Sequence, residues 1–283
     1  MKKITIYLLA ILMLPIFVLA QSGKVFDNLS MKSKILSMDR KYSVYLPADY
    51  ETSNRSYPVL YLLHGSGDNQ TGWVQFGEVN QIADKAIAEG KSTSMIIVMP
   101  DANTQKMGYF NAMDGSFNYE DFFFQEFIPF IEKTYRTRTE KKYRAVAGLS
   151  MGGGGTLIYA LHHPELFAAA CPLSAAVKMW SKKPADNASN PIPQEQIDAY
   201  NNKYDAIYLV NNMPDSQKTQ VRWYIDCGDD DFLYEGNSLL HIALRKKEIP
   251  HEYRVRDGGH TWSYWRTALP EVLSFVSQSF HQF

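Results

Sequence analysis

Cysteine is scarce in this sequence of 283 residues, with only Cys171 and Cys227 present. Both lie in apolar, strand-like segments, and they lack the spacing of metal ligands. We therefore expect two buried free thiols, while the pairing of neighbouring strands leaves a disulfide between them open. Motifs for binding zinc, calcium or phosphate are also missing, so the sequence predicts neither a metal nor a cofactor.

An excess of basic charge is likewise absent. The chain has 29 Lys and Arg against 30 Asp and Glu, and the formal net charge is −1 at pH 7. No basic stripe is present that would attract a phosphate backbone. This composition argues against a nucleic-acid partner.

Long apolar runs are confined to the first residues of the chain. Lys2 and Lys3 precede an uncharged apolar stretch at 4–19, and Ala20 precedes the polar Gln21. This order is typical of a secretory signal peptide over 1–20 that is cleaved near Ala20, and the stretch is too short for a membrane anchor. We expect a secreted or periplasmic mature chain over 21–283 that has no membrane contact after cleavage.

The most informative motif that is present places a serine between two glycines directly after an apolar run. Residues 148–152 read Gly-Leu-Ser-Met-Gly. A strand that turns sharply into a helix at such a motif exposes the serine hydroxyl above the sheet, an arrangement called a nucleophile elbow. An ordinary glycine-rich turn is the alternative. However, residues 152–155 are all glycine at a helix start, where each glycine costs about 0.5–1 kcal/mol of stability relative to alanine. Such a costly choice indicates that the backbone closely approaches the sheet or a ligand. Ser150 is our candidate nucleophile.

A nucleophilic serine needs a base, and one of the seven histidines has a suitable setting. His260 follows a strand-like segment at 252–256 and lies on a loop after Gly258 and Gly259. It also comes after both the serine and the candidate acids, and serine, acid, histidine is the chain order that accompanies a nucleophile elbow. His260 is therefore our candidate base.

The acid comes from a crowded turn after the strand predicted at 221–227. Three adjacent carboxylates follow Gly228, and they cannot all be buried because each would need its own partner. Asp231 is best placed to turn back toward the histidine loop, with Asp230 as the alternative. We interpret Asp226 and Asp229 as turn or cap residues.

An oxyanion hole needs two backbone N–H groups that face the developing negative charge. Met151, the residue after the nucleophile, is expected to supply one. Ser66 is expected to supply the other, because residues 64–67 read His-Gly-Ser-Gly directly after a buried strand at 57–63. We interpret His64 as a structural hydrogen-bonding residue.

These motifs together resemble the esterase D-like family of α/β-hydrolases. The family includes carbohydrate esterase family 1, with its feruloyl and acetylxylan esterases, and the S-formylglutathione hydrolases. The resemblance rests on four motifs in fixed order, at 64–68, 148–152, 226–233 and 258–262. Carried over position by position, it implies Ser150 as nucleophile, Asp231 as acid and His260 as base, with the amides of Ser66 and Met151 as the oxyanion hole. The family often has glycine in place of Ser66, but a backbone donor does not depend on that side chain.

Strand and helix signals alternate along the chain, which predicts a doubly wound, mostly parallel sheet with helices on both faces. An early antiparallel strand is expected at 42–46, a long helix at 119–135 and a C-terminal helix from about 268 to 280. Residues 175–220 interrupt the alternation with several prolines and read as an irregular lid or substrate wall. The 45% hydrophobic content suffices for one α/β domain with a single core.

Aromatic residues offer the only clue to the substrate in the sequence itself. Trp73, Tyr109 and Trp262 fall on or near the catalytic loops and are predicted contacts for a sugar or a phenolic acyl group. With the resemblance and the leader, they favour a secreted esterase that removes feruloyl or acetyl groups from xylan, with a polysaccharide or oligosaccharide ester as partner. The alternatives are an S-formylglutathione hydrolase or other small-ester esterase, and a non-catalytic carbohydrate-binding module on a hydrolase scaffold.

Overall fold

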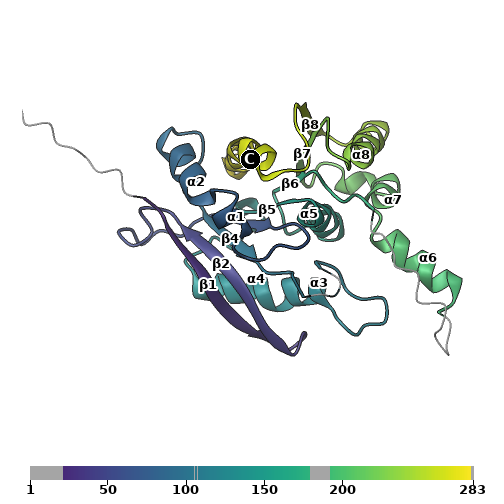
Figure 1. The fold of residues 1–283 in the computed structure, drawn as a ribbon, viewed down its shortest axis with the longest axis horizontal. Coiled ribbons are helices and arrows are strands. Elements are labelled where there is room, and N and C mark those ends of the chain that lie inside the picture. Colours follow the sequence, from purple (N-terminus) through teal and green to yellow (C-terminus); the bar gives the residue numbers. More distant parts are fainter. Residues whose placement is uncertain (1–21, 105, 107, 179–191, 282–283) are drawn as a thin grey trace, which may run out of the picture.

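A mixed sheet of eight strands runs through the computed structural model, which describes residues 22–104, 106, 108–178 and 192–281. The strand order is β1-β2-β4-β3-β5-β6-β7-β8 (Figure 1). β2 is antiparallel to both of its neighbours, and from β4 to β8 the strands run parallel. The strands span Lys24–Ser33 (β1), Met38–Leu46 (β2), Val59–Leu63 (β3), Ile96–Pro100 (β4), Arg144–Leu149 (β5), Ala169–Leu173 (β6), Arg222–Gly228 (β7) and His251–Arg256 (β8).

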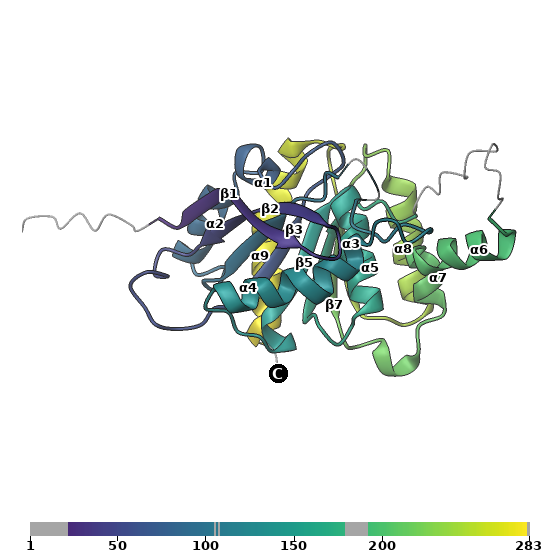
Figure 2. The same cartoon turned by 90° about the horizontal axis from the view of Figure 1, so that it is seen from below.

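Helices cover both faces of this sheet (Figures 1 and 2). One apolar cluster joins α2 and α9 to one face, and the other cluster joins α3, α4, α5 and α8 to the opposite face. Because both faces are covered, every residue of β3, β4, β5 and β6 is buried. The helices span Gly72–Gln75 (α1), Val79–Ala88 (α2), Tyr119–Phe122 (α3), Ile128–Thr134 (α4), Met151–His162 (α5), Gln194–Lys203 (α6), Ala206–Asn211 (α7), Tyr234–Lys246 (α8) and Trp262–His281 (α9).

The predicted α/β class and its mostly parallel sheet are confirmed, but two predicted helices differ in detail. The helix expected at 119–135 contains a π-helical turn over Phe123–Phe127, so that α3 and α4 flank a wider turn. Phe122, Phe123 and Phe127 are all buried around that turn. The C-terminal helix starts at Trp262 rather than near 268, because the residues directly after His260 already pack on the core.

The segment at 175–220 is less irregular than predicted. Its described part contains α6 and α7. Tyr200 donates a hydrogen bond of 2.6 Å to the main-chain oxygen of Asn111, and Tyr204 donates one of 2.8 Å to Glu120, so α6 is tied to the body of the domain. Residues 179–191 of this segment, and the predicted signal peptide at 1–20, lie outside the described residues.

Both cysteines are buried and free. Burial raises the pKa of the Cys227 thiol to about 12, with a smaller contribution from nearby carboxylates. Among the helices that the structure describes, none combines the length and the apolar character needed to cross a membrane.

Candidate active site

Ser150 occupies a sharp turn between β5 and α5. Its φ of 55° and ψ of −116° are a backbone conformation that a residue with a side chain rarely adopts, with a cost on the order of 1–3 kcal/mol. The Ser150 N–H donates to the Leu173 carbonyl at 2.9 Å, and its own carbonyl accepts from Gly154 and Ala176 at 3.0 Å each. These bonds to β6, α5 and the following loop hold the strained serine in place.

Glycine is required around Ser150 because the elbow packs directly on the end of β3. A Cβ atom on Gly152 would lie 2.6 Å from the main-chain oxygens of both Leu63 and His64. A Cβ atom on Gly148 would lie 2.6 Å from the oxygen of Gly152. The close approach therefore explains why residues of poor helix propensity open α5.

The structure brings Ser150, His260 and Asp231 together from three loops at the carboxyl edge of the sheet. Nε2 of His260 lies 2.9 Å from Oγ of Ser150, and Nδ1 of His260 lies 2.8 Å from Oδ2 of Asp231. A carboxylate can only accept, so Nδ1 carries a proton and Nε2 is left to accept the serine proton. This is the geometry of a nucleophile, a base and an orienting acid.

Asp231 is fully buried, whereas Asp229 and Asp230 are exposed. Burial acts to raise the pKa of Asp231, but hydrogen bonds from the His260 ring, the Leu233 N–H and the Ser174 hydroxyl outweigh it. The net result is a pKa below the usual value. Asp231 therefore stays ionised beside His260.

Asp226 is not the turn or cap residue that we predicted. It lies inside β7 with no exposed surface, and its carboxylate accepts hydrogen bonds from Tyr224, Tyr264 and Arg256. Sequence reasoning missed this role because Arg256 and Tyr264 lie 30 and 38 residues further along the chain.

Ser66 and Met151, the predicted oxyanion donors, lie on the two segments that meet beside Ser150. Met151 is the first residue of α5, where main-chain N–H groups are free and the helix dipole favours negative charge. Ser66 follows Gly65, whose Cα lies so close to the elbow that an added Cβ would be 3.5 Å from Cβ of Ser150.

His64 and Tyr109 hold the loop that carries Ser66. Nε2 of His64 accepts the Ala102 N–H at 2.9 Å, and Nδ1 lies 2.7 Å from the Gly65 carbonyl, to which it donates. The Tyr109 hydroxyl accepts the His64 N–H at 2.8 Å and donates to the His64 carbonyl at 3.2 Å. The side chain of His64 thus joins the ends of β3 and β4 and is not free for catalysis.

Two of the three predicted substrate contacts are buried. Trp73 and Tyr109 have no exposed surface, and Nε1 of Trp73 donates to the Leu63 carbonyl at 3.0 Å. Both side chains are hydrogen-bonded to the main chain at the end of β3, so they support the loop that carries Ser66. Our prediction that Trp73 and Tyr109 contact substrate is therefore wrong. Trp262 is half-buried, with its ring 5.2 Å from that of Trp73, and stays a predicted contact.

Sequence reasoning missed Phe232, which is 72% exposed with its ring 4.5 Å from the His260 ring.

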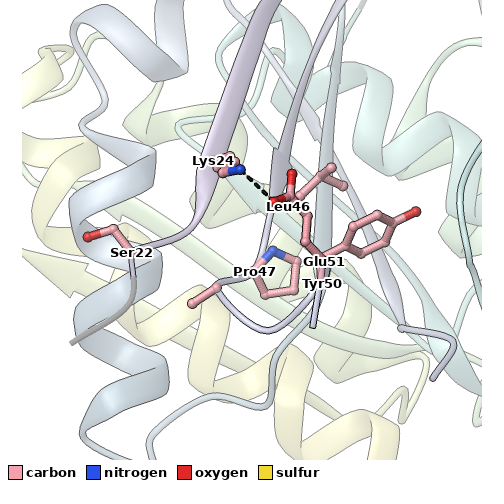
Figure 3. A pocket seen from close by; sticks show the side chains of 7 residues that line it. Ser22, Lys24, Leu46, Pro47, Tyr50 and Glu51 are labelled. Carbon is pink, nitrogen blue, oxygen red and sulfur yellow. Dashed lines mark hydrogen bonds and ion pairs between the residues drawn. The ribbon is translucent and has the colours of Figure 1, made fainter. Parts of the chain in front are cut away.

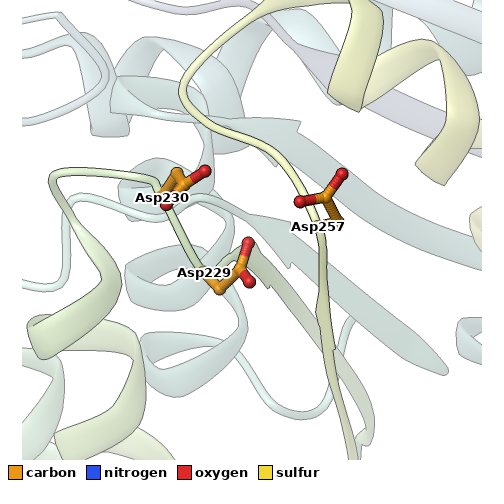
Figure 4. A group of neighbouring side chains, drawn as sticks. All are labelled: Asp229, Asp230 and Asp257. Carbon is orange, nitrogen blue, oxygen red and sulfur yellow. The ribbon is translucent and has the colours of Figure 1, made fainter.

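Two other features have the residue types of a binding site, but neither is built as one. The exposed carboxylates of Asp229, Asp230 and Asp257 have oxygens within 4.8 Å of one another (Figure 4), and Asp229 already accepts the Gly258 N–H. A cavity of about 20 Å³ lies beside the end of β2 (Figure 3). Because β2 is antiparallel to β4, this end of β2 lies at the edge of the sheet away from Ser150. That volume is close to the space of one water molecule. The cavity is lined by Ser22, Lys24, Leu46, Pro47, Ala48, Tyr50 and Glu51.

Comparison with known proteins finds a family model and several similar esterases. The model of the family described as "Putative esterase" matches residues 33–276. A solved structure of a ferulic acid esterase is 36% identical, covers 92% of this chain and 99% of its own, and superposes with a TM-score of 0.81. The esterase Rv1288 of Mycobacterium tuberculosis is 33% identical over an alignment of 255 residues that covers 78% of this chain, and the chain spans about half (52%) of that relative's length. An endo-1,4-beta-xylanase/feruloyl esterase of Xylanibacter ruminicola is 40% identical over an alignment of 132 residues that covers 44% of this chain and 18% of that relative. The chain therefore belongs to the "Putative esterase" family and has the α/β-hydrolase fold.

Proposed function

We propose that this chain is a serine esterase in which Ser150 is the nucleophile, His260 the general base and Asp231 the acid that orients the base. The observation that carries the proposal is the pair of hydrogen bonds, 2.9 and 2.8 Å long, that join the three side chains in this order. The buried, ionised Asp231 stabilises the imidazolium that forms when His260 takes a proton.

The reaction begins when Nε2 of His260 removes the proton of Ser150 as Oγ attacks the ester carbonyl carbon. The tetrahedral intermediate collapses, the carbon–oxygen bond to the alcohol breaks, and the alcohol leaves with the proton from His260. A water molecule then gives its proton to His260 and attacks the acyl-enzyme. The acid is released, and the proton returns to Ser150.

The negative charge on the carbonyl oxygen is stabilised by the N–H groups of Met151 and Ser66. Support comes from the position of Met151 at the N-terminus of α5 and from the contact of Gly65 with the elbow. Removal of one donor of such a pair typically costs about 10²–10³ in kcat. The bonds from His64 and Tyr109 keep the Ser66 loop rigid, so its donor does not have to reorganise during the reaction.

We infer a feruloyl or acetyl ester on xylan as the substrate and export from the cytoplasm as the setting. The similarity to a ferulic acid esterase and to the endo-1,4-beta-xylanase/feruloyl esterase of X. ruminicola supports a feruloyl ester. Phe232 supplies an exposed aromatic face beside His260 on which a phenolic ring could stack. The leader at 1–20 supports export.

A substrate panel tests the proposal. Purified protein is assayed with methyl ferulate, acetylated xylan, p-nitrophenyl acetate and S-formylglutathione, and kcat/KM is compared. We expect methyl ferulate or acetylated xylan to be preferred over S-formylglutathione. If S-formylglutathione were the best substrate, the proposed extracellular role would be wrong.

A further inference from the structure

The loop that carries His260 is held at both of its ends by one buried carboxylate. We call residues 257–261 the base loop. Arg256 immediately precedes this loop and Tyr264 follows it closely, and both donate to Asp226 on β7. We propose that Asp226 is a positioning residue that sets His260 against Ser150. This inference rests on the proposed function of the triad.

The carboxylate of Asp226 is saturated by these contacts. Oδ1 accepts from the Tyr264 hydroxyl and, at 3.1 Å, from Nη2 of Arg256. Oδ2 accepts from the Tyr224 hydroxyl at 2.9 Å and from the same Arg256 nitrogen at 3.0 Å. A carboxylate offers about four acceptor sites, and all of them are used.

Main-chain contacts continue the attachment from β7 into the base loop. The Asp229 N–H donates to the Arg256 carbonyl, and the Asp230 N–H donates to the Gly258 carbonyl, each at 3.1 Å. In return, the Gly258 N–H donates to Oδ1 of Asp229 at 3.1 Å. A Cβ atom on Gly228 would lie 1.9 Å from the Gly258 oxygen, so the two loops are in direct contact. The acid and the base are therefore carried by loops that are locked to each other.

Directed bonds suit a positioning role better than apolar contacts would. A buried ion pair adds little net stability compared with apolar side chains of the same volume, so stability alone does not explain this cluster. Arg256 and Tyr264 lie on either side of His260 in the chain, and both donate hydrogen bonds to the same fixed carboxylate. These bonds do define where the imidazole lies. A misplacement of about 1 Å in such a group can lower the rate about 10²-fold.

The chain provides a matched pair of variants to test this. Tyr224 and Tyr264 both donate a hydroxyl to Asp226 and both are almost fully buried, but only Tyr264 belongs to the base-loop side of the cluster. We expect Tyr264→Phe to lower kcat about tenfold or more while KM for p-nitrophenyl acetate stays within about twofold. We expect Tyr224→Phe to leave kcat within about twofold. The two variants should lower the melting temperature by similar amounts, because each removes one buried hydroxyl that donates to Asp226.

A spectroscopic measurement separates positioning from loss of stability. The Nδ1 proton of His260, bonded to Asp231, gives a downfield proton NMR resonance that reports the geometry of that hydrogen bond. It should shift or broaden in Tyr264→Phe and stay unchanged in Tyr224→Phe. Asp226→Asn should lose more kcat than Tyr264→Phe, and the double variant should lose less than the product of the two effects, because both changes break the same contact.

Equal kcat values and unchanged resonances in the two tyrosine variants would overturn the role of Asp226, even if Asp226→Asn does not fold. The Ser150→Ala variant is measured in the same series. If Ser150→Ala is inactive while the two tyrosine variants behave alike, only the present inference fails. If Ser150→Ala keeps its activity, the proposed triad itself fails.

Discussion

Replacement of Gly152 by alanine tests the close contact between the elbow and the sheet. In an ordinary helix this change stabilises a protein by about 0.5–1 kcal/mol, because alanine has the better helix propensity. Here the new Cβ would lie 2.6 Å from the main-chain oxygens of Leu63 and His64, whereas an ordinary carbon–oxygen contact is about 3.3 Å. Overpacking of this kind costs about 1–3 kcal/mol, so we expect a net destabilisation of about 1–2 kcal/mol.

Gly236 in α8 is the matched control. A Cβ on Gly236 would have its nearest neighbour, Cβ of Val177, at 3.5 Å, which is ordinary contact. Gly236→Ala should therefore be neutral or stabilising by up to about 1 kcal/mol. The free energy of unfolding in urea, followed by tryptophan fluorescence, measures both variants. Gly152→Ala should also lose activity because it displaces the turn at Ser150, and equal stability of the two variants would refute the packing argument.

Two further predictions concern the acid and the aromatic residue beside the base. Asp231→Asn should lower kcat on the order of 10⁴-fold, while Asp229→Asn stays within a few-fold. Because the folded-state pKa of Asp231 is lowered, its carboxylate stabilises the fold above the unfolded pKa of about 4, and this contribution is lost as the pH falls through the folded-state value. Thermal unfolding as a function of pH should therefore show the stability gap between wild type and Asp231→Asn closing below about pH 4, and a constant gap would contradict the ionised state. Phe232→Ala should raise KM for methyl ferulate several-fold with little change for p-nitrophenyl acetate. Its effect on stability should stay within about 0.5 kcal/mol, because the side chain is 72% exposed. Unchanged KM values for both substrates would exclude Phe232 from the substrate site.

The sequence is most informative where chemistry restricts the choice of residue. Glycine is required on both sides of Ser150 by contacts at 2.6 Å, so the motif at 148–152 is visible in the sequence as a run of glycines at a helix start. The buried central strands are equally visible, because strands covered on both faces are continuous apolar runs. These two signals predict the fold class and the serine loop.

Side chains whose partners lie far away in the sequence are not visible in this way. Asp226 looks like a member of an acidic turn, and only the fold brings Arg256 and Tyr264 to it. Tyr109 resembles a loop aromatic, yet its hydroxyl is bonded to the main chain of His64, 45 residues away. β1 was not predicted because it is an edge strand with mostly exposed residues, which lacks a clear apolar alternation.

The central claim is that the oxygen of Ser150 forms the bond to the acyl group. The most direct measurement is kcat/KM of Ser150→Ala on p-nitrophenyl acetate, compared with that of the wild type. The melting temperatures of the two proteins are measured as well, and equal values show that the variant is folded. The account predicts a loss of several orders of magnitude with an intact fold, because the hydroxyl that lies 2.9 Å from Nε2 of His260 is the one that the substitution removes. Hydrolysis by Ser150→Ala at a rate near that of wild type would contradict it.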